Sequence, residues 1–215
     1  TYSLTGATGS TGSNTLAGVQ FNKGVTTVVW TVADAAGNQK SCSFTVTVSD
    51  DDLPWVTCPG NLSRNTQSPT CTYTASGTEF DTTGSGDNCA VVSTTYSLSG
   101  VTSGTGNNTL AGVVFSKGIT TVEWTVADAA GNQSSCSFTV TVNDDDVPLV
   151  TCVGNQARGT DAAGCYYTTA STEFDIISSW DNCGVVSTTY ALSGLTTGTG
   201  SNTLAGVQFN KGLTT

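Results

Sequence analysis

Residues 121–142, TVEWTVADAAGNQSSCSFTVTV, carry the clearest secondary-structure pattern of the chain. Val122, Trp124 and Val126 alternate with polar residues and therefore share one face of a strand. The same alternation returns over Cys136–Val142, after the turn-forming residues 128–133. Two strand patterns joined by a short polar segment predict a β-hairpin, and we expect Trp124 to anchor a core. The alternative for Trp124, a platform for stacking a sugar, stays open at this point.

The hairpin belongs to a unit that recurs without gaps. The tetrapeptide TYSL at residue 1 returns at residue 95 and, as TYAL, at residue 189, so the period from 1 to 95 and from 95 to 189 is 94 residues. An internal period is the signature of a tandem array. The same shift relates Trp30 to Trp124, Cys42 to Cys136, Cys58 to Cys152, Cys71 to Cys165, and Cys89 to Cys183.

Acidic linkers separate the units. Asp50, Asp51 and Asp52 stand just before Pro54, and the triplet recurs as Asp144, Asp145 and Asp146 before Pro148. A charged stretch marked by proline between strand patterns is typical of an interdomain linker. We therefore expect the end of one repeat at 1–52, a complete repeat at 53–146 and the beginning of another at 147–215. We expect a segment of a longer array, with a polymer completed by a donor strand from a neighbouring chain as the alternative.

Composition sets the fold class. Thr, Val and aromatic residues favour strands, and no apolar stretch keeps a helical period. Six or seven short strands in 94 residues predict an all-β chain of tandem immunoglobulin-like sandwiches. Eight cysteines predict disulfide staples and an oxidising, extracellular location, either secreted or on a cell surface.

Composition also excludes several functions. The chain has no His and no evident catalytic constellation, so we expect that it is not an enzyme. Its net charge of −10 argues against nucleic acid, which needs clustered Lys and Arg, and permits cation binding. No apolar run is long enough to span a membrane in this segment.

The complete repeat resembles the hyalin repeat (HYR) family. The motifs that carry the resemblance are Thr57-Cys58-Pro59-Gly60-Asn61, Asp87-Asn88-Cys89, Lys117-Gly118-Ile119-Thr120-Thr121-Val122, Asp128-Ala129-Ala130-Gly131-Asn132 and Ser135-Cys136-Ser137-Phe138. The resemblance implies an immunoglobulin-like domain from an extracellular, often adhesive, multi-repeat protein, including bacterial surface proteins. Two features depart from the pattern: Val153 replaces the proline found at Pro59, and a long Gly, Thr and Ser loop is expected over 99–108.

Cysteine spacing suggests a pairing scheme. Cys58 and Cys71 lie symmetrically about a turn near Arg64 and Asn65, and a hairpin in that register would bring them together. The third and last strands should bring another pair together at one end of the sandwich. The predicted bridges are Cys58–Cys71, Cys152–Cys165 and Cys89–Cys136, with Cys42 and Cys183 pairing outside this chain or with a neighbouring copy.

Four residues are candidates for glycosylation. Asn61, Asn107 and Asn132 lie in N-x-S/T sequons, which matter only if the source modifies Asn. Thr82, in Asp81-Thr82-Thr83, resembles an O-linked signal of some bacterial surface proteins. Chance occurrence in a chain rich in Thr and Ser is the alternative.

The acidic residues cluster where repeats should meet. In an immunoglobulin-like sandwich, two loops of the complete repeat should lie at the same end as the incoming linker. Crowded carboxylates repel one another unless a cation neutralises them, and Ca²⁺ takes six to eight oxygen ligands. The predicted first site contains Asp50, Asp51, Asp52, Asp81, Asp87, Asn88 and Asp128. The predicted second site contains Asp144, Asp145, Asp146, Asp175, Asp181 and Asn182. A solvated acidic spacer is the alternative.

These features favour a structural segment of an extracellular filament or cell-surface stalk, stiffened by Ca²⁺ at its junctions. The expected partners are neighbouring copies of the same protein in a fibre. The alternative is an adhesin that binds a glycan or a cell-surface ligand through its Gly- and Thr-rich loops. A module attached to an enzyme is a third class.

Overall fold

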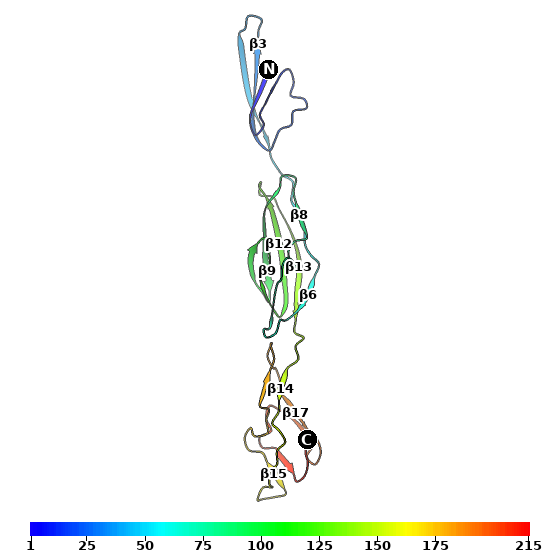
Figure 1. Cartoon of the computed structure of the whole chain (residues 1–215). Coiled ribbons are helices and arrows are strands. Elements are labelled where there is room, and N and C mark those ends of the chain that lie inside the picture. The colour runs from blue at the N-terminus through cyan, green and yellow to red at the C-terminus, as the bar shows by residue number, and fades with distance from the viewer.

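The chain is a string of three β-rich bodies in sequence order, shown in Figure 1 with the termini in the two outer bodies. The computed structural model describes all 215 residues and contains 19 strands. It holds no helix with the length and apolarity that a membrane crossing requires. The predicted all-β, tandem architecture is confirmed.

The middle repeat is built on a five-stranded sheet. The sheet order is β10-β9-β12-β13-β6, and β12 and β13 are the hairpin predicted from the sequence, with Trp124 opposite Cys136. β6 pairs with β13 in the parallel direction. The bounds are β6 Leu62–Asn65, β9 Val91–Gly100, β10 Gly104–Asn107, β12 Gly118–Asp128 and β13 Gln133–Asn143.

Two short strand pairs complete the repeat. They are β5 (Trp55–Thr57) with β8 (Gly84–Gly86), and β7 (Thr72–Thr74) with β11 (Val114–Ser116). Between these pairs and the five-stranded sheet lies a cluster of ten buried residues. Trp124 is fully buried in it, and its indole Nε1 donates to the Phe80 carbonyl at 3.0 Å. The indole is therefore a core anchor, and a role in stacking sugars is ruled out because no face of the ring reaches solvent.

The long loop predicted over residues 99–108 is instead the turn and second arm of a hairpin, β9–β10. Gly100 has a φ of 107° and would bring a side chain against the Ile119 carbonyl, so only glycine fits. Gly106 lies under the Tyr96 ring, which leaves no room for a Cβ. The polar, glycine-rich composition of this segment suggested an irregular loop. Instead, Gly100 and Gly106 allow neighbouring strands and the Tyr96 ring to pack closely in a sheet.

The outer bodies repeat parts of the middle one. Residues 1–52 form the sheet β2-β1-β3-β4, the counterpart of β10-β9-β12-β13. Residues 147–215 form the pairs β14–β16, β15–β19 and β17–β18, the counterparts of β5–β8, β7–β11 and β9–β10. The bounds are β1 Tyr2–Gly6, β2 Ser10–Gly12, β3 Gly24–Ala33, β4 Gln39–Val48, β14 Leu149–Thr151, β15 Tyr166–Thr168, β16 Ser178–Trp180, β17 Thr189–Leu192, β18 Gly198–Ser201 and β19 Gln208–Asn210.

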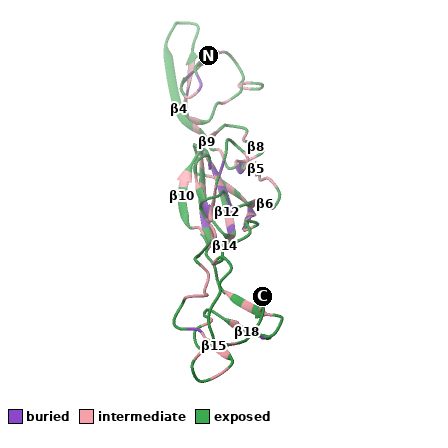
Figure 2. Cartoon of the chain, turned by 60° about the horizontal axis from the view of Figure 1, so that its bottom comes forward, coloured by how far each residue is buried: buried purple, intermediate pink, exposed green.

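Burial separates the middle body from the outer two. Figure 2 shows that buried residues concentrate in the middle repeat. Phe138 is 4% exposed, whereas its counterpart Phe44 is 48% exposed. Phe138 is covered by the short strand pairs, and residues 1–52 contain no counterpart of those pairs.

A polar network at the edge of the middle core repeats in the third body. Glu79 accepts hydrogen bonds from Arg64, from the Tyr73 hydroxyl and from the Ser76 N–H. Burial opposes ionisation of Glu79, but these donors outweigh it and hold the pKa of the carboxyl below its usual range. Glu173 has the corresponding partners Tyr167 and Arg158, and its pKa is also lowered, first by the Tyr167 hydroxyl.

Candidate cation site and disulfides at the repeat junctions

Three carboxylates meet where the first linker enters the middle repeat. Asp50 lies in the linker, Asp87 follows β8, and Asp128 ends β12. One oxygen from each lies within 4.8 Å of the other two. The topology explains the meeting, because β8 and β12 both end at the pole that receives the linker. These three residues are the part of the predicted first site that the fold brings together.

Asp128 is held by the turn of the hairpin. Its Oδ1 accepts from the backbone N–H groups of Ala130, Gly131 and Asn132 at 2.7–2.9 Å, and its Oδ2 accepts from Asn132 Nδ2 at 2.8 Å. Burial disfavours the charged form, but the Asn132 side chain and the backbone donors outweigh it and lower the pKa of Asp128. Asp34 accepts the same kind of hydrogen bonds in the first body, so this residue type stabilises the turn of the hairpin in both repeats.

Asp50 connects the first body to the junction. Its Oδ2 accepts from Lys23 Nζ at 2.8 Å, and its side chain is only 1% exposed. This hydrogen bond raises the pKa of the Lys23 ammonium. The other oxygen, Oδ1, is buried and has no hydrogen-bond partner.

Asp87 is the second residue with an unsatisfied oxygen. Its Oδ2 accepts from the Cys89 N–H at 2.7 Å, whereas its Oδ1 is buried and has no partner. With Lys23 included, the three carboxylates leave a formal charge of −2. Buried anionic oxygens without donors are costly, so this pocket favours a divalent cation.

The other residues of the predicted first site lie around the cluster or away from it. Asn88 Nδ2 donates to Asp52 Oδ2 at 2.6 Å, so this pair braces the linker. Asp51 is exposed. Asp81 accepts from the Leu110 N–H at 2.8 Å, which fixes the chain ahead of β11. Asp81 is not among the three carboxylates that meet at the junction, and its part in the predicted site stays a prediction.

The second junction repeats the arrangement in part. Asp144 accepts from Lys117 Nζ at 3.0 Å, and Asp181 accepts from the Cys183 N–H at 2.8 Å, as their counterparts do. The Asp144 Oδ1 and the Asn182 Oδ1 are buried without partners. The position 94 residues after Asp128 lies beyond residue 215, so the third carboxylate is not part of this sequence.

The remaining acids of the predicted second site accept hydrogen bonds elsewhere or are exposed. Asp175 accepts from the Leu204 N–H at 2.7 Å, as Asp81 does from Leu110, and its part in the cation site stays a prediction. Asp145 accepts from Asn65 Nδ2, and Asp146 is exposed.

Sequence reasoning missed the two lysines. Lys23 and Lys117 each stand 27 residues before the linker aspartate that they contact. Their identical spacing in two copies was the signal that could have revealed them.

The disulfides differ from those predicted. Cys58 bonds to Cys136, with their Cα atoms 5.8 Å apart, and Cys71 bonds to Cys183 across the second junction, with Cα atoms 4.7 Å apart. The proposed bridges Cys58–Cys71, Cys89–Cys136 and Cys152–Cys165 are therefore wrong. The segment after Cys58 does not form a hairpin with β7. It runs parallel to β13 as β6, which places Cys58 beside Cys136.

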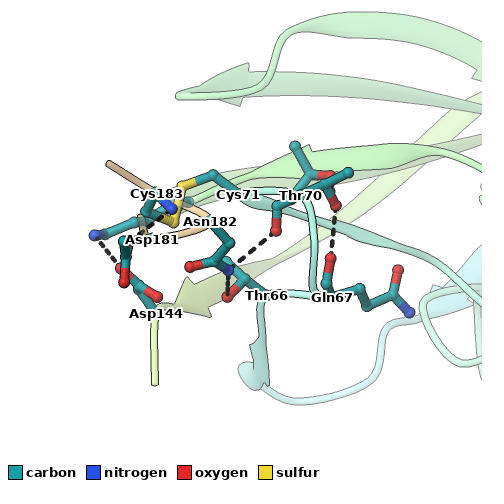
Figure 3. Close-up of a disulfide and its surroundings, with 10 residues drawn as sticks. Thr66, Gln67, Thr70, Cys71, Asp144, Asp181, Asn182 and Cys183 are labelled. Atoms are coloured by element: carbon teal, nitrogen blue, oxygen red, sulfur yellow. Dashed lines mark hydrogen bonds and ion pairs between the residues drawn. A yellow bond between two sulfur atoms is a disulfide. The ribbon is translucent and has the colours of Figure 1, made fainter. Parts of the chain in front are cut away.

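Figure 3 shows the surroundings of the bridge between repeats. The Asn182 Nδ2 donates to Thr66 Oγ1 at 2.9 Å and to the Thr70 carbonyl at 3.1 Å, so a residue of the third body contacts the turn beside Cys71. Asp144 and Asp181 lie on the same side of the disulfide in this view. Cys183 thus pairs within this chain, with the cysteine of the preceding repeat that the predicted scheme had assigned to Cys58.

Comparison with known proteins agrees with this architecture. The model of the HYR domain matches residues 3–48 and again residues 49–142. The chain belongs to the HYR domain family. It is 33% identical to hyalin of Strongylocentrotus purpuratus over 166 residues, which are 73% of this chain and 13% of that protein. It is 29% identical over 126 residues to the serine-rich adhesin for platelets of Staphylococcus aureus (strain USA300), covering 59% of this chain and 5% of the adhesin.

The predicted glycosylation sites differ in their availability on the HYR repeats. Asn132 Nδ2 donates to Asp128 and to the Asp50 carbonyl, and a glycan would replace one of its two amide hydrogens, so at least one of these contacts would be lost. The structure therefore disfavours Asn132 as a glycan site, which stays an untested prediction. Asn61 and Asn107 are exposed and Thr82 is half-buried, and all three stay predictions.

Proposed function

We propose that this chain is a structural segment of an extracellular filament or cell-surface stalk, in which Ca²⁺ stiffens the junctions between HYR repeats. The observation that carries the proposal is the pair of buried, unpartnered oxygens, Asp50 Oδ1 and Asp87 Oδ1, beside Asp128. The disulfides support an oxidising environment. The proposal includes no catalysis.

Calcium suits this pocket better than other common cations. Ca²⁺ prefers oxygen ligands and tolerates irregular geometry, whereas Mg²⁺ demands a near-ideal octahedron. All three acids offer carboxylate oxygens, and two of them come from segments without regular structure, which can adjust to an ion. The formal charge of −2 left after Lys23 matches one divalent ion.

The position of the ion explains how it would act on the rod. Asp50 belongs to the linker, and Asp87 and Asp128 belong to the following repeat. Lys23 reaches Asp50 from the preceding body. A cation held by all three acids would tie the linker to the following repeat, so the junction would lose the freedom of a hinge.

Calcium titration of the whole chain tests this proposal. We expect isothermal titration to show saturable Ca²⁺ binding and the melting temperature to rise with free Ca²⁺, because a ligand of the folded state stabilises it. The Asp51→Asn variant is the matched control, since Asp51 is exposed, and it should behave like the parent. Unchanged melting after EGTA, with complete removal of calcium confirmed by elemental analysis, would contradict the proposal.

An adhesin is the second candidate, because one relative is named as an adhesin for platelets. Recognition would then use exposed Gly- and Thr-rich segments such as the β9–β10 turn. Electron microscopy of the native material separates the two candidates. A uniform fibre built of these repeats supports the structural role, and a globular tip on a stalk supports the adhesin.

A further inference from the structure

Four of the eight cysteines have no partner within the chain. They are Cys42, Cys89, Cys152 and Cys165, and all four are exposed. Exposed thiols do not persist in an oxidising compartment, where cysteines normally pair. The two bridges that do form, Cys58–Cys136 and Cys71–Cys183, suggest where the partners lie.

Each unpaired cysteine is the 94-residue counterpart of a paired one. Cys152 corresponds to Cys58 and Cys42 to Cys136, the two ends of the bridge within a repeat. Cys165 corresponds to Cys71 and Cys89 to Cys183, the two ends of the bridge between repeats. In every case the partner required by the same spacing lies outside residues 1–215.

The local structure around three of these cysteines matches that of the paired ones in a strand register or a backbone hydrogen bond. Cys42 lies opposite Trp30, as Cys136 lies opposite Trp124. The Lys211 N–H donates to the Cys165 carbonyl, as the Lys117 N–H donates to the Cys71 carbonyl.

The match extends to the other end of the bridge between repeats. The Cys89 N–H donates to Asp87, as the Cys183 N–H donates to Asp181. Cys42, Cys89 and Cys165 therefore share a strand register or a backbone hydrogen bond with their paired counterparts.

We propose that the four unpaired cysteines form the same two kinds of bridge with cysteines outside residues 1–215, which lie in the rest of the same HYR repeat for Cys42 and Cys152 and in an adjoining repeat for Cys89 and Cys165. Cys89 would pair with the Cys71 counterpart of the repeat before it, and Cys165 with the Cys183 counterpart of the repeat after it. Cys42 and Cys152 would each complete a bridge of the Cys58–Cys136 type. The inference rests on the filament part of the proposed function and does not depend on calcium.

The chemistry of each bridge is an oxidation of two thiols. One S–S bond forms and two S–H bonds break, and two protons and two electrons pass to a disulfide-forming oxidant of the secretory or extracellular compartment. Every junction then has two covalent connections, the acidic linker and the bridge beside it. Neighbouring repeats stay joined when either connection is cut.

Thiol labelling of two samples tests the proposal. The native protein and the 215-residue chain are each denatured with N-ethylmaleimide and without reductant, then digested at acidic pH and mapped by mass spectrometry. In the chain alone, we expect label on Cys42, Cys89, Cys152 and Cys165 and none on the other four. In the native protein, we expect none of the four to be labelled, and each to be recovered in a disulfide-linked peptide with the partner type named above.

The pattern of linked peptides also identifies the source of the partner. Bridges that persist in a single chain on a denaturing, non-reducing gel place the partner repeat in the same polypeptide, and bridges that yield multimers place it in another copy. Both outcomes support the proposal. Label on these cysteines in the native protein, or bridges such as Cys42–Cys89, would overturn it. The labelling result says nothing of calcium binding, which titration measures separately, so the failure of one proposal can be told from the failure of the other.

Discussion

The two junctions have nearly the same residues but hold their repeats together differently. At the first junction, the linker meets three carboxylates and Cys89 is unpaired. At the second, two counterparts of those acids are present and Cys183 is bonded to Cys71 of the preceding repeat. The cation pocket needs the hairpin of the repeat that follows, whereas the disulfide needs β7 of the repeat that precedes. The three-acid cluster is therefore present at the first junction and the disulfide at the second.

The comparison can be tested most strongly by cutting each linker in turn. A protease site inserted between Asp145 and Asp146 should allow cleavage without separation, because the Cys71–Cys183 bridge crosses that junction. The same site inserted between Asp51 and Asp52 should release two fragments. Denaturing gels without reductant distinguish the outcomes, and added reductant should separate both. Fragments that part at the second junction without reductant would disprove the bridge.

The next largest difference between the two junctions should be in their affinity for Ca²⁺. The Asp87→Asn variant removes a ligand of the three-acid pocket and should weaken Ca²⁺ binding by about tenfold or more, equivalent to roughly 1.4 kcal/mol. Asp181→Asn is the matched variant at the junction that lacks the third acid, and it should leave the tightest binding step unchanged. Isothermal titration measures both. Equal losses in the two variants would place the site elsewhere.

The pH dependence of the free energy of unfolding allows the repeats on either side of the second junction to be compared. The folded-state pKa of Glu79 is lowered, so its contribution is present above the ordinary Glu pKa of about 4.3 and is lost as pH falls through the folded value. Glu79→Gln should therefore reduce stability near neutral pH and flatten its decline in acid. Glu173→Gln should do so less, because Arg158 contacts Glu173 at 3.3 Å, whereas Arg64 reaches Glu79 at 2.7 Å. Chemical unfolding at stepped pH measures both effects, and a larger effect at Glu173 would contradict this ranking.

The smallest effect should come from the exposed linker acids. Asp51→Asn and Asp146→Asn remove charges that make no contact described above, so each should change the free energy of unfolding by less than about 0.5 kcal/mol. Denaturant unfolding provides the measurement. A larger loss from Asp51→Asn would mean that the whole acidic linker, and not the three-acid pocket, binds the ion.

The sequence predicted the features that depend on local alternation and on the repeat. The β12–β13 hairpin and the buried Trp124 follow from a period of two, and the meeting of Asp50, Asp87 and Asp128 follows from strand ends at one pole. One failure came from a pairing that no local pattern reveals. Cys58 was misassigned because β6 runs parallel to a strand about 78 residues away, and such pairing leaves no turn signal between the strands.

The acids outside the three-acid cluster teach a related lesson. Asp81 and Asp175 have the same residue type as the cluster residues and lie one short strand before Asp87 and Asp181, but their carboxylates accept from backbone N–H groups of their own repeat. The sequence indicated which segments are rich in acidic residues. Only the fold distinguishes an acid that can bind a cation from one whose carboxylate accepts hydrogen bonds from a loop. Lys23 and Lys117 are the opposite case. Each precedes a turn-forming glycine, and nothing in this local sequence indicated the ion pair that each forms with a linker aspartate.

Small-angle X-ray scattering of the chain with and without Ca²⁺ tests most directly whether an ion stiffens the junction. With saturating Ca²⁺, the account predicts a narrower distribution of interatomic distances, because the first junction is held at one angle. EGTA should broaden the distribution, and Asp87→Asn should show the broad form in both conditions. Identical scattering of the parent chain before and after proven removal of calcium would contradict the account.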